Sequence, residues 1–275
     1  MTIVHILNTI LSTLFDLLFR PFRGFDPVWA LVFVSLLTGI LMVWVFGKVS
    51  NQEGIRQKKN KIRGNLLGVR LYQHDVAVVL RLQRRIFRDT LSYMGYSLAP
   101  MLALIIPLLL IIAQLNLYFS ARPFQAGEQA LVKARFDGIA LMTQPISLKS
   151  SGGVTVETPP VRIDSQSEVA WRVRAQEAGH HRLAVQVGET TVDKGFYVEE
   201  GWGPAPGLRT SSALDLLLYP GEAPLDPDQN LKSIEVSYRP LPLAIWGWEI
   251  HWLVLFFVLS MIFAFAFKGV FGVEL

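Results

Sequence analysis

Cysteine is missing altogether from this sequence of 275 residues. Its absence excludes disulfides, zinc–thiolate centres and cysteine nucleophiles. The sequence also lacks the G-x-x-x-x-G-K-[ST] phosphate loop, the G-x-S-x-G nucleophile elbow and the H-E-x-x-H zinc helix. His180 and His181 are adjacent next to a predicted strand, so their side chains point in different directions and are not expected to share a metal. We therefore predict that the chain is not an enzyme and that it needs no cofactor and no metal.

Charge is missing from two long stretches of the chain. Val28–Gly47 is twenty residues long and Leu98–Phe119 is twenty-two, and neither contains a charged side chain. A bilayer core of about 30 Å takes roughly 20 apolar residues of a helix. A third stretch, Ile250–Phe267, is nearly all apolar, with Trp246, Trp248 and Trp252 around its start and Lys268 after it. The sequence predicts three transmembrane helices, at 25–48, 93–119 and 244–268.

Positive charge is concentrated between the first two of these stretches. Residues 48–89 contain eleven Lys or Arg against three acids, although the whole chain has a net charge of only +4. A short loop this rich in cations stays in the cytoplasm. We therefore expect a multi-pass protein of the bacterial plasma (inner) membrane. Residues 49–92 and the tail 269–275 would be cytoplasmic, and residues 120–243 extracytoplasmic.

The basic segment 49–92 reads as a mobile helical hairpin, an antiparallel coiled-coil-like pair that turns at Tyr72–Asp75. Apolar residues at helical spacing form a stripe in each half, for example Ile55 and Ile62 in the first and Val79 and Ile86 in the second. Its clustered cations predict binding to anionic lipids or to the ribosome, and not to DNA. The cations selected for this role are Lys58, Lys59, Lys61, Arg63, Arg81, Arg84, Arg85 and Arg88.

Residues 1–24 are predicted to form an amphipathic helix that ends near Arg20, Pro21 and Gly24. Its polar residues recur at spacings of three and four and make one stripe on a helix otherwise built of Ile, Leu and Phe. Such a helix lies in the membrane interface. An additional spanning helix is the alternative.

Residues 120–243 change to the two-residue period of strands with one buried face. Val169, Trp171 and Val173 alternate with Ala170, Arg172 and Arg174, and two later segments repeat the pattern. About seven short strands without helical periodicity predict an immunoglobulin-like β-sandwich. Gly201–Gly207 is expected to be a rigid loop. The predicted fold class is thus an α-helical membrane protein with an inserted all-β domain.

A few polar residues interrupt the apolar helices. Ser35 and Thr38 lie in the first, and Gln114 and Asn116 lie in the second, where Pro100 and Pro107 predict kinks. One interpretation is ordinary hydrogen bonding between helices. The other is a groove open to the cytoplasm that admits polar chain into the bilayer, where unsatisfied backbone groups cost several kcal/mol each.

This layout resembles the core of the YidC/Oxa membrane-insertase superfamily, especially its short three-helix members such as archaeal YidC-like proteins and the third subunit of the ER membrane complex. The resemblance is carried by DPVWALVFVSLLTGILMVWVFGKVSNQ (26–52), RLQRRIFRDT (81–90) and LAPMLALIIPLLLIIAQLNLYF (98–119). It covers residues 1–120 and 245–270 and concerns layout more than sequence motifs. The chain departs from the family in having no cation in Val28–Gly47, where bacterial members carry a groove arginine, and in the position of its β-domain.

The resemblance implies a factor that assists the entry or assembly of membrane segments, with nascent membrane proteins or other membrane-complex subunits as partners. The alternative is a membrane-anchored structural or interaction protein that binds a partner through the β-sandwich. A polar groove open to the cytoplasm would favour the first. Tightly packed helices in which Ser35 and Thr38 are hydrogen-bonded internally would favour the second.

Overall fold

The structure is a computed structural model that describes residues 2–138, 144–226, 231–245 and 247–273. The predicted interface anchor Trp246 and the last two residues of the tail lie outside the described residues. The chain divides into two compact units. The β-unit comprises Met1–Ala30 and Leu109–Trp252, and the helical unit comprises Leu31–Leu108 and Leu253–Leu275.

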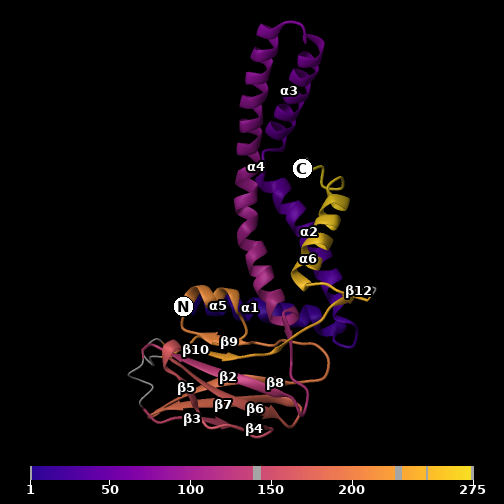
Figure 1. Cartoon of the computed structure of the whole chain (residues 1–275). Coiled ribbons are helices and arrows are strands. Elements are labelled where there is room, and N and C mark those ends of the chain that lie inside the picture. The colour runs from indigo at the N-terminus through magenta and orange to yellow at the C-terminus, as the bar shows by residue number, and fades with distance from the viewer. Residues whose placement is uncertain (1, 139–143, 227–230, 246, 274–275) are drawn as a thin grey trace. The chain divides into compact units, whose positions relative to one another are not determined.

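The strands form two main antiparallel sheets in the β-unit (Figure 1). The larger sheet has six strands in the order β4-β6-β2-β10-β9, with β5 also paired to β6. These strands are β2 (Gln129–Phe136), β4 (Val154–Val156), β5 (Val161–Ile163), β6 (Glu168–Ala175), β9 (Leu208–Thr210) and β10 (Leu231–Val236). The second sheet, in the order β3-β7-β8, consists of β3 (Ile146–Ser150), β7 (Gly179–Val187) and β8 (Thr190–Val198).

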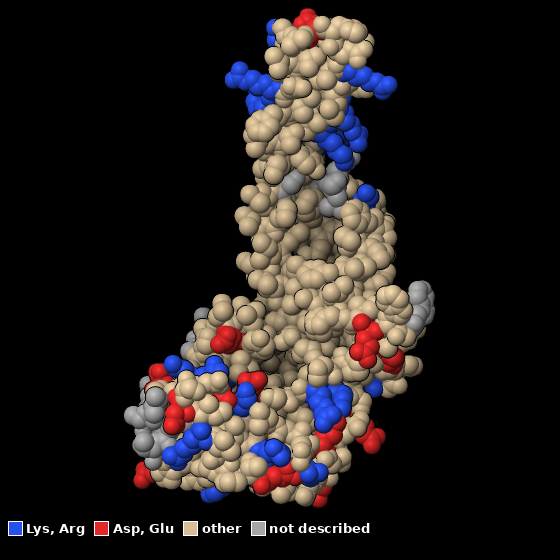
Figure 2. Space-filling model, in the orientation of Figure 1, with Lys and Arg blue, Asp and Glu red and all other residues tan. Residues whose placement is uncertain are grey.

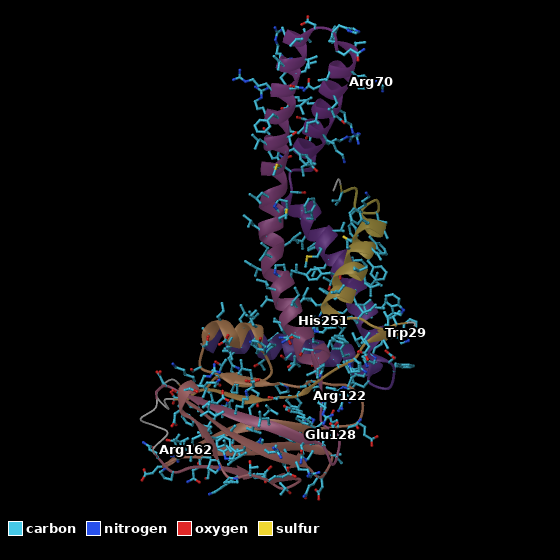
Figure 3. The ribbon with its side chains drawn as sticks, in the orientation of Figure 1. Trp29, Arg70, Arg122, Glu128, Arg162 and His251 are labelled. Carbon is cyan, nitrogen blue, oxygen red and sulfur yellow. The ribbon has the colours of Figure 1, made fainter. Side chains whose placement is uncertain are left out.

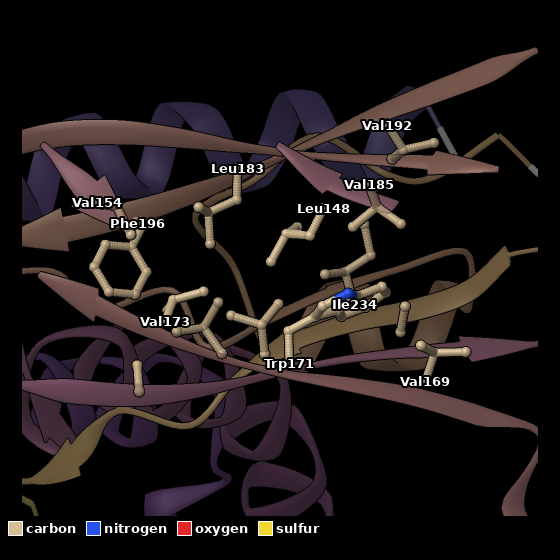
Figure 4. Packing of buried hydrophobic residues seen from close by; sticks show 14 of the residues in the cluster. Leu148, Val154, Val169, Trp171, Val173, Leu183, Val185, Val192, Phe196 and Ile234 are labelled. Carbon is tan, nitrogen blue, oxygen red and sulfur yellow. The ribbon is translucent and has the colours of Figure 1, made fainter. Parts of the chain in front are cut away.

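The two sheets share one hydrophobic core (Figure 4). Val169, Trp171 and Val173 of β6 are buried in it together with Leu183 and Val185 of β7. These are the residues that the alternation in the sequence assigns to the inner face, and a sheet buried on one side requires this two-residue period. The prediction of a β-domain is therefore confirmed, and its two sheets form a sandwich.

The strand pairings match those of an immunoglobulin domain in part. That fold has one sheet in the order A-B-E-D and a second in the order C-F-G. Here β2, β6 and β4 pair as B, E and D do, and β3, β7 and β8 pair as C, F and G do. The place of strand A beside β2 is taken by β10, which comes late in the chain. The immunoglobulin-like fold of the whole domain stays a prediction.

Six α-helices are described. They are α1 (Thr2–Phe19), α2 (Pro27–Val49), α3 (Gln52–Leu71), α4 (Val76–Phe119), the short α5 (Ala213–Leu218) and α6 (Trp252–Phe267). Short elements complete the chain, namely 3₁₀ helices at Arg20–Phe22 and Asp164–Gln166 and two small ladders that pair β1 (Ala121–Arg122) with β11 (Arg239–Pro240) and β12 (Ala244–Ile245) with β13 (Trp248–Glu249).

Helix α4 is one continuous helix of 44 residues. The sequence predicted a short hairpin helix, a boundary at residue 92 and a separate spanning helix, whereas the kinks at Pro100 and Pro107 stay a prediction. Instead α4 runs without interruption from the turn after Asp75 through Pro100 and Pro107 to Phe119. A proline removes one backbone hydrogen bond, and a helix can continue past that loss where the flanking turns stay bonded.

Two described helices, α2 and α4, are long and apolar enough to cross a bilayer, as judged by length and composition. Helix α6 is also apolar but has only 16 residues. It begins two residues later than the start of the apolar stretch Ile250–Phe267, because the chain first forms the β12–β13 ladder.

Candidate functional surfaces

The basic hairpin is formed by α3, the turn at Tyr72–Asp75 and the first part of α4. Ile55 is buried near its base, and Lys58 on α3 donates a hydrogen bond of 2.9 Å to Asp89 on α4. Toward the turn, the two helices approach closely where Gly68 faces Leu82, since a Cβ on Gly68 would lie 3.1 Å from a Leu82 methyl. The Lys58–Asp89 ion pair and a narrow apolar seam thus hold the two helices of the hairpin together.

Asp89 is nearly fully buried, and its carboxylate is stabilised in the charged form. The hydrogen bond from Lys58 holds the pKa of Asp89 below its usual value, against the opposing effect of burial, and Arg88 and Lys61 add to the lowering. Asp89 and Lys58 therefore offset each other's charge, which leaves the remaining cations of the hairpin in excess.

Most of the cations predicted to bind a polyanion lie on the hairpin surface (Figure 2). Lys58 and Lys59 are half-buried, and six are exposed, namely Lys61, Arg63, Arg81, Arg84, Arg85 and Arg88. A shallow hollow of about 500 Å³ between the two helices is lined by Lys61, Arg85 and Arg88 together with Gly64, Asn65 and Asp89. Arg70 lies close to the turn (Figure 3). The helical surface from Leu98 to Leu108 carries no charge, so the cations of α4 are confined to its hairpin part.

Helices α2 and α6 cross at Gly39. A Cβ at this position would lie 2.8 Å from the backbone oxygen of Ser260 and 2.9 Å from Cβ of Phe263, so only glycine fits. Two turns further on, a Cβ at Gly47 would lie 2.9 Å from Val273. Small residues that let two backbones approach are the usual means of helix packing in a bilayer.

Ser35 and Thr38, two of the four predicted groove residues, are buried on α2 in the helical unit. Ser35 lies one turn before Gly39, on the same face of the helix. Among the described residues its hydroxyl has no hydrogen-bond partner, and neither has the hydroxyl of Ser260 on α6. Their role in a groove stays a prediction.

Gln114 and Asn116, the other two, lie near the end of α4 in the β-unit, so the four residues are divided between the two units. Gln114 is fully buried and accepts a 3.0 Å hydrogen bond from Ser12 of α1, while its Nε2 has no partner among the described residues. Asn116 is half-buried and lines a cavity of about 400 Å³ beside Ser120, Tyr219 and Glu235.

The polar stripe of α1 contacts α5 and the end of α4 within the β-unit. Asn8 is buried and donates a 2.5 Å hydrogen bond to the backbone oxygen of Leu216 in α5. The opposite face is apolar and exposed, with large side chains at spacings of four, four and three, namely Ile6, Ile10, Leu14 and Leu17. The sequence identified the stripe, but only the structure shows that protein, and not water, covers much of it.

The loop Gly201–Gly207 packs against α1 and the end of α4 within the β-unit. The Trp202 ring stacks on Phe119 at 5.5 Å between centroids and meets Phe19 edge-on at 5.8 Å. Its Nε1 donates a 3.0 Å hydrogen bond to the backbone oxygen of Phe25, and Ala205 N donates one of 2.9 Å to Leu117 O. The sequence predicted a rigid loop here without this role.

The β-unit contains a buried ion pair that the sequence had not led us to predict. Lys194 on β8 is fully buried, and its Nζ donates 2.5 Å hydrogen bonds to Glu222 and to the backbone oxygen of Pro206. Burial lowers the pKa of Lys194, and Glu222 opposes this shift. The signal was available, because Lys194 takes an inward position in the alternation of Val192 and Phe196.

Arg122 and Glu128 form a second pair in the β-unit, where their side chains point toward each other (Figure 3). Two hydrogen bonds of 2.8 and 3.0 Å join the guanidinium to the carboxylate. The bonds from Arg122 lower the pKa of Glu128 from 4.5 to about 2. A pair that satisfies both partners is structural in character, and we assign it no chemistry.

Within the described ranges no group of three or more His, Cys, Asp or Glu residues could hold a metal ion. Comparison of the chain with protein-family models, with curated proteins and with solved structures found no match. Function is therefore inferred from the residues and their surroundings.

Proposed function

We propose that the chain is a multi-pass membrane protein that assists the entry or assembly of membrane segments, an insertase-like or chaperone-like factor of the YidC/Oxa kind. It acts without nucleotide or metal. Its partners are the lipid bilayer, anionic lipids or the ribosome at the basic hairpin, and nascent membrane proteins or other membrane-complex subunits.

The character of α2 and α4 supports placement in a bilayer. Only 39% of the most apolar window of α2 and 24% of that of α4 is buried. The core helix of a water-soluble domain would be mostly buried, so these surfaces need another apolar environment. Helix α6, about 24 Å long, is the third span, and modest thinning of the bilayer or flanking residues would make up its length.

Charge supports the orientation. The eleven cations between Lys48 and Asp89 put the hairpin in the cytoplasm, and Lys268 after α6 puts the C-terminal tail there. The β-unit strands are then extracytoplasmic in a bacterial inner membrane. Helix α1, with its apolar face free and its polar face on protein, lies in the membrane interface.

Buried hydroxyls without partners are the observation that carries the insertase proposal. Ser35 on α2 and Ser260 on α6 each keep an unpaired hydroxyl in otherwise apolar helices. A segment entering the membrane carries backbone groups that lipid cannot satisfy. These hydroxyls would bond to such groups, while the cationic hairpin holds the anionic surface from which clients arrive.

The function can be tested by measuring how much of a short-tailed membrane protein inserts into proteoliposomes that contain the purified protein. We expect more insertion than in empty liposomes, and a loss of most of that gain in Ser35→Ala/Thr38→Val, which keeps the side-chain volumes. The control Thr9→Val/Thr13→Val removes two hydroxyls that bond to their own helix. Insertion no better than in empty liposomes would refute the proposal.

Single cysteines introduced at the exposed positions Asn60 and Thr190 test the orientation, since the chain has no other cysteine. A membrane-impermeant thiol reagent added outside whole cells should label Thr190→Cys and leave Asn60→Cys untouched. The reverse pattern would overturn the topology.

A membrane-anchored interaction protein is the second candidate. The observation that favours it is the cavity of about 400 Å³ in the β-unit, beside the firmly packed Trp202 loop. A polar ligand or peptide from an extracytoplasmic partner would fit there. This role takes precedence if the insertion assay fails while Asn116→Leu, which removes a polar group from the cavity wall, abolishes co-purification of a partner with the full chain.

A further inference from the structure

One face of α4 carries large apolar side chains at heptad spacing, and these side chains are exposed. Its members are Leu80, Phe87, Leu91, Met94, Leu98 and Met101, each between 53 and 68% exposed. The spacings of seven, four, three, four and three are those of a coiled-coil seam. Arg84 occupies the core position that remains between Leu80 and Phe87. We call this face the α4 stripe.

The α4 stripe is not the seam of the basic hairpin. Helix α3 packs on the other side of α4, where Leu82 and Ile86 are half-buried and Asp89 is buried and bonded to Lys58. A helix that already has one neighbour and shows a second heptad face has room for another helix on that face.

Lipid covers at most one end of the α4 stripe. The last charged residue of α4 is Asp89, so residues 90–119 are uncharged, and Leu80 lies eighteen residues before Leu98 along the same helix. At 1.5 Å per residue that is about 27 Å. If α4 crosses the bilayer at 93–119, Met94, Leu98 and Met101 face lipid, while Leu80 and Phe87 lie in the charged part of the helix outside it. Apolar side chains in that position need a protein partner.

We propose that the α4 stripe binds a helix of a second membrane protein that runs beside α4 and carries acidic residues beside its apolar face. Charge complementarity is the argument. Arg81, Arg84 and Arg88 lie within or beside the Leu80–Leu91 half of the stripe and are all exposed. Gly95, next to Met94, has open space where a Cβ would be, so a partner helix can approach closely there.

A second copy of this chain does not fit. Copies in one membrane share an orientation, so their α4 helices would pair in parallel and in register. Arg84 would then face Arg84 at a core position, with Arg81 and Arg88 on the flanks. Like charges at these positions oppose pairing, whereas glutamate or aspartate on a partner helix would complement them.

A designed peptide can probe the α4 stripe in full-length protein reconstituted in nanodiscs. The peptide has about three heptads with leucine at the core positions and glutamate at the flanks, and carries a fluorophore for anisotropy. We expect it to bind, and binding to weaken about tenfold or more in Phe87→Gln/Leu91→Gln and with a lysine-flanked peptide. Leu66→Gln/Leu71→Gln, also exposed but on α3, should bind like the unchanged protein.

Equal binding to the stripe variant, or equal binding of the two peptides, would overturn the proposal, provided circular dichroism shows unchanged helix content. A disulfide-linked dimer formed by Met94→Cys would assign the stripe to a second copy instead. Quenching of a fluorophore at Phe87→Cys by quencher-bearing lipids would assign it to the bilayer. The inference rests on the proposed membrane placement but not on insertase activity, because peptide binding is measured without a client.

Discussion

The two units treat apolar side chains in opposite ways. In the β-unit the apolar residues of the strands converge on one core that excludes water, with Trp171 and Phe196 fully enclosed. In the helical unit, large apolar side chains such as Leu41, Trp44 and Ile106 remain exposed, although Leu31, Phe256 and a small cluster around Val43 are buried. Burial therefore holds the first unit together, whereas the second depends on an apolar surrounding and on close backbone contacts.

The units also differ in what fixes their contacts. In the β-unit, ladders of backbone hydrogen bonds join the strands of each sheet, and buried side chains fill the space between the two sheets. Helices α2 and α6 are joined where side chains are smallest, at Gly39. Substitutions should therefore harm the first unit when they remove volume and the second when they add it.

Removal of volume from the β core should have the largest effect. Trp171→Ala is expected to lower the free energy of unfolding by about 3–5 kcal/mol, because it leaves a cavity between two sheets. Unfolding followed by the β-sheet circular dichroism signal measures this. Leu131→Ala, on the exposed side of β2, should cost no more than about 1 kcal/mol. Similar losses in both variants would contradict the comparison.

Addition of volume at the helix crossing comes next. Gly39→Leu should separate α2 from α6 at a cost of about 1–3 kcal/mol, because the new side chain meets the Ser260 backbone. Cysteines at Val43 and Val273, which share one cluster, should crosslink in the parent chain and fail to do so in this variant. Gly64→Leu, added where nothing lies within 4 Å, is the control and should leave the crosslink intact.

Loss of hairpin cations should have a smaller, salt-dependent effect. Lys61→Gln/Arg85→Gln/Arg88→Gln keeps the Lys58–Asp89 pair and is expected to weaken binding to anionic liposomes or ribosomes about tenfold at low salt. Flotation or co-sedimentation at increasing salt measures it. The matched control removes three cations from the β-unit, Lys149, Arg172 and Arg182. An equal loss there would mean that net charge, not the hairpin, controls binding.

The pH response of the Arg122–Glu128 pair should be the smallest effect. The pKa of Glu128 is lowered in the folded state, so the pair stabilises the β-unit above the usual pKa of 4.5. That stability should be lost as pH falls from 4.5 to about 2. Glu128→Gln and Arg122→Gln should each flatten the curve of unfolding free energy over this range. An unchanged slope in either variant would contradict the assignment.

Local patterns in the sequence predicted the local features of the fold. The two-residue period assigned Val169 and Trp171 to the core, and the hairpin turn lies at Tyr72–Asp75 as expected. Uncharged runs indicated α2 and the apolar part of α4. Each of these features depends on residues that are close together in the chain, so it can be predicted from a single sequence.

Partners distant in the chain were decided only by the tertiary structure. Nothing near β2 in the sequence specifies that it pairs with both β6 and β10, and nothing near Gly39 specifies Ser260 as its neighbour. Likewise Asn8 could have faced water, yet it bonds to the backbone of Leu216. The sequence by itself determined which surfaces are apolar, polar or cationic, because these follow from side-chain chemistry and local period. Which surface meets which depends on the packing of the whole chain, and no local pattern encodes that.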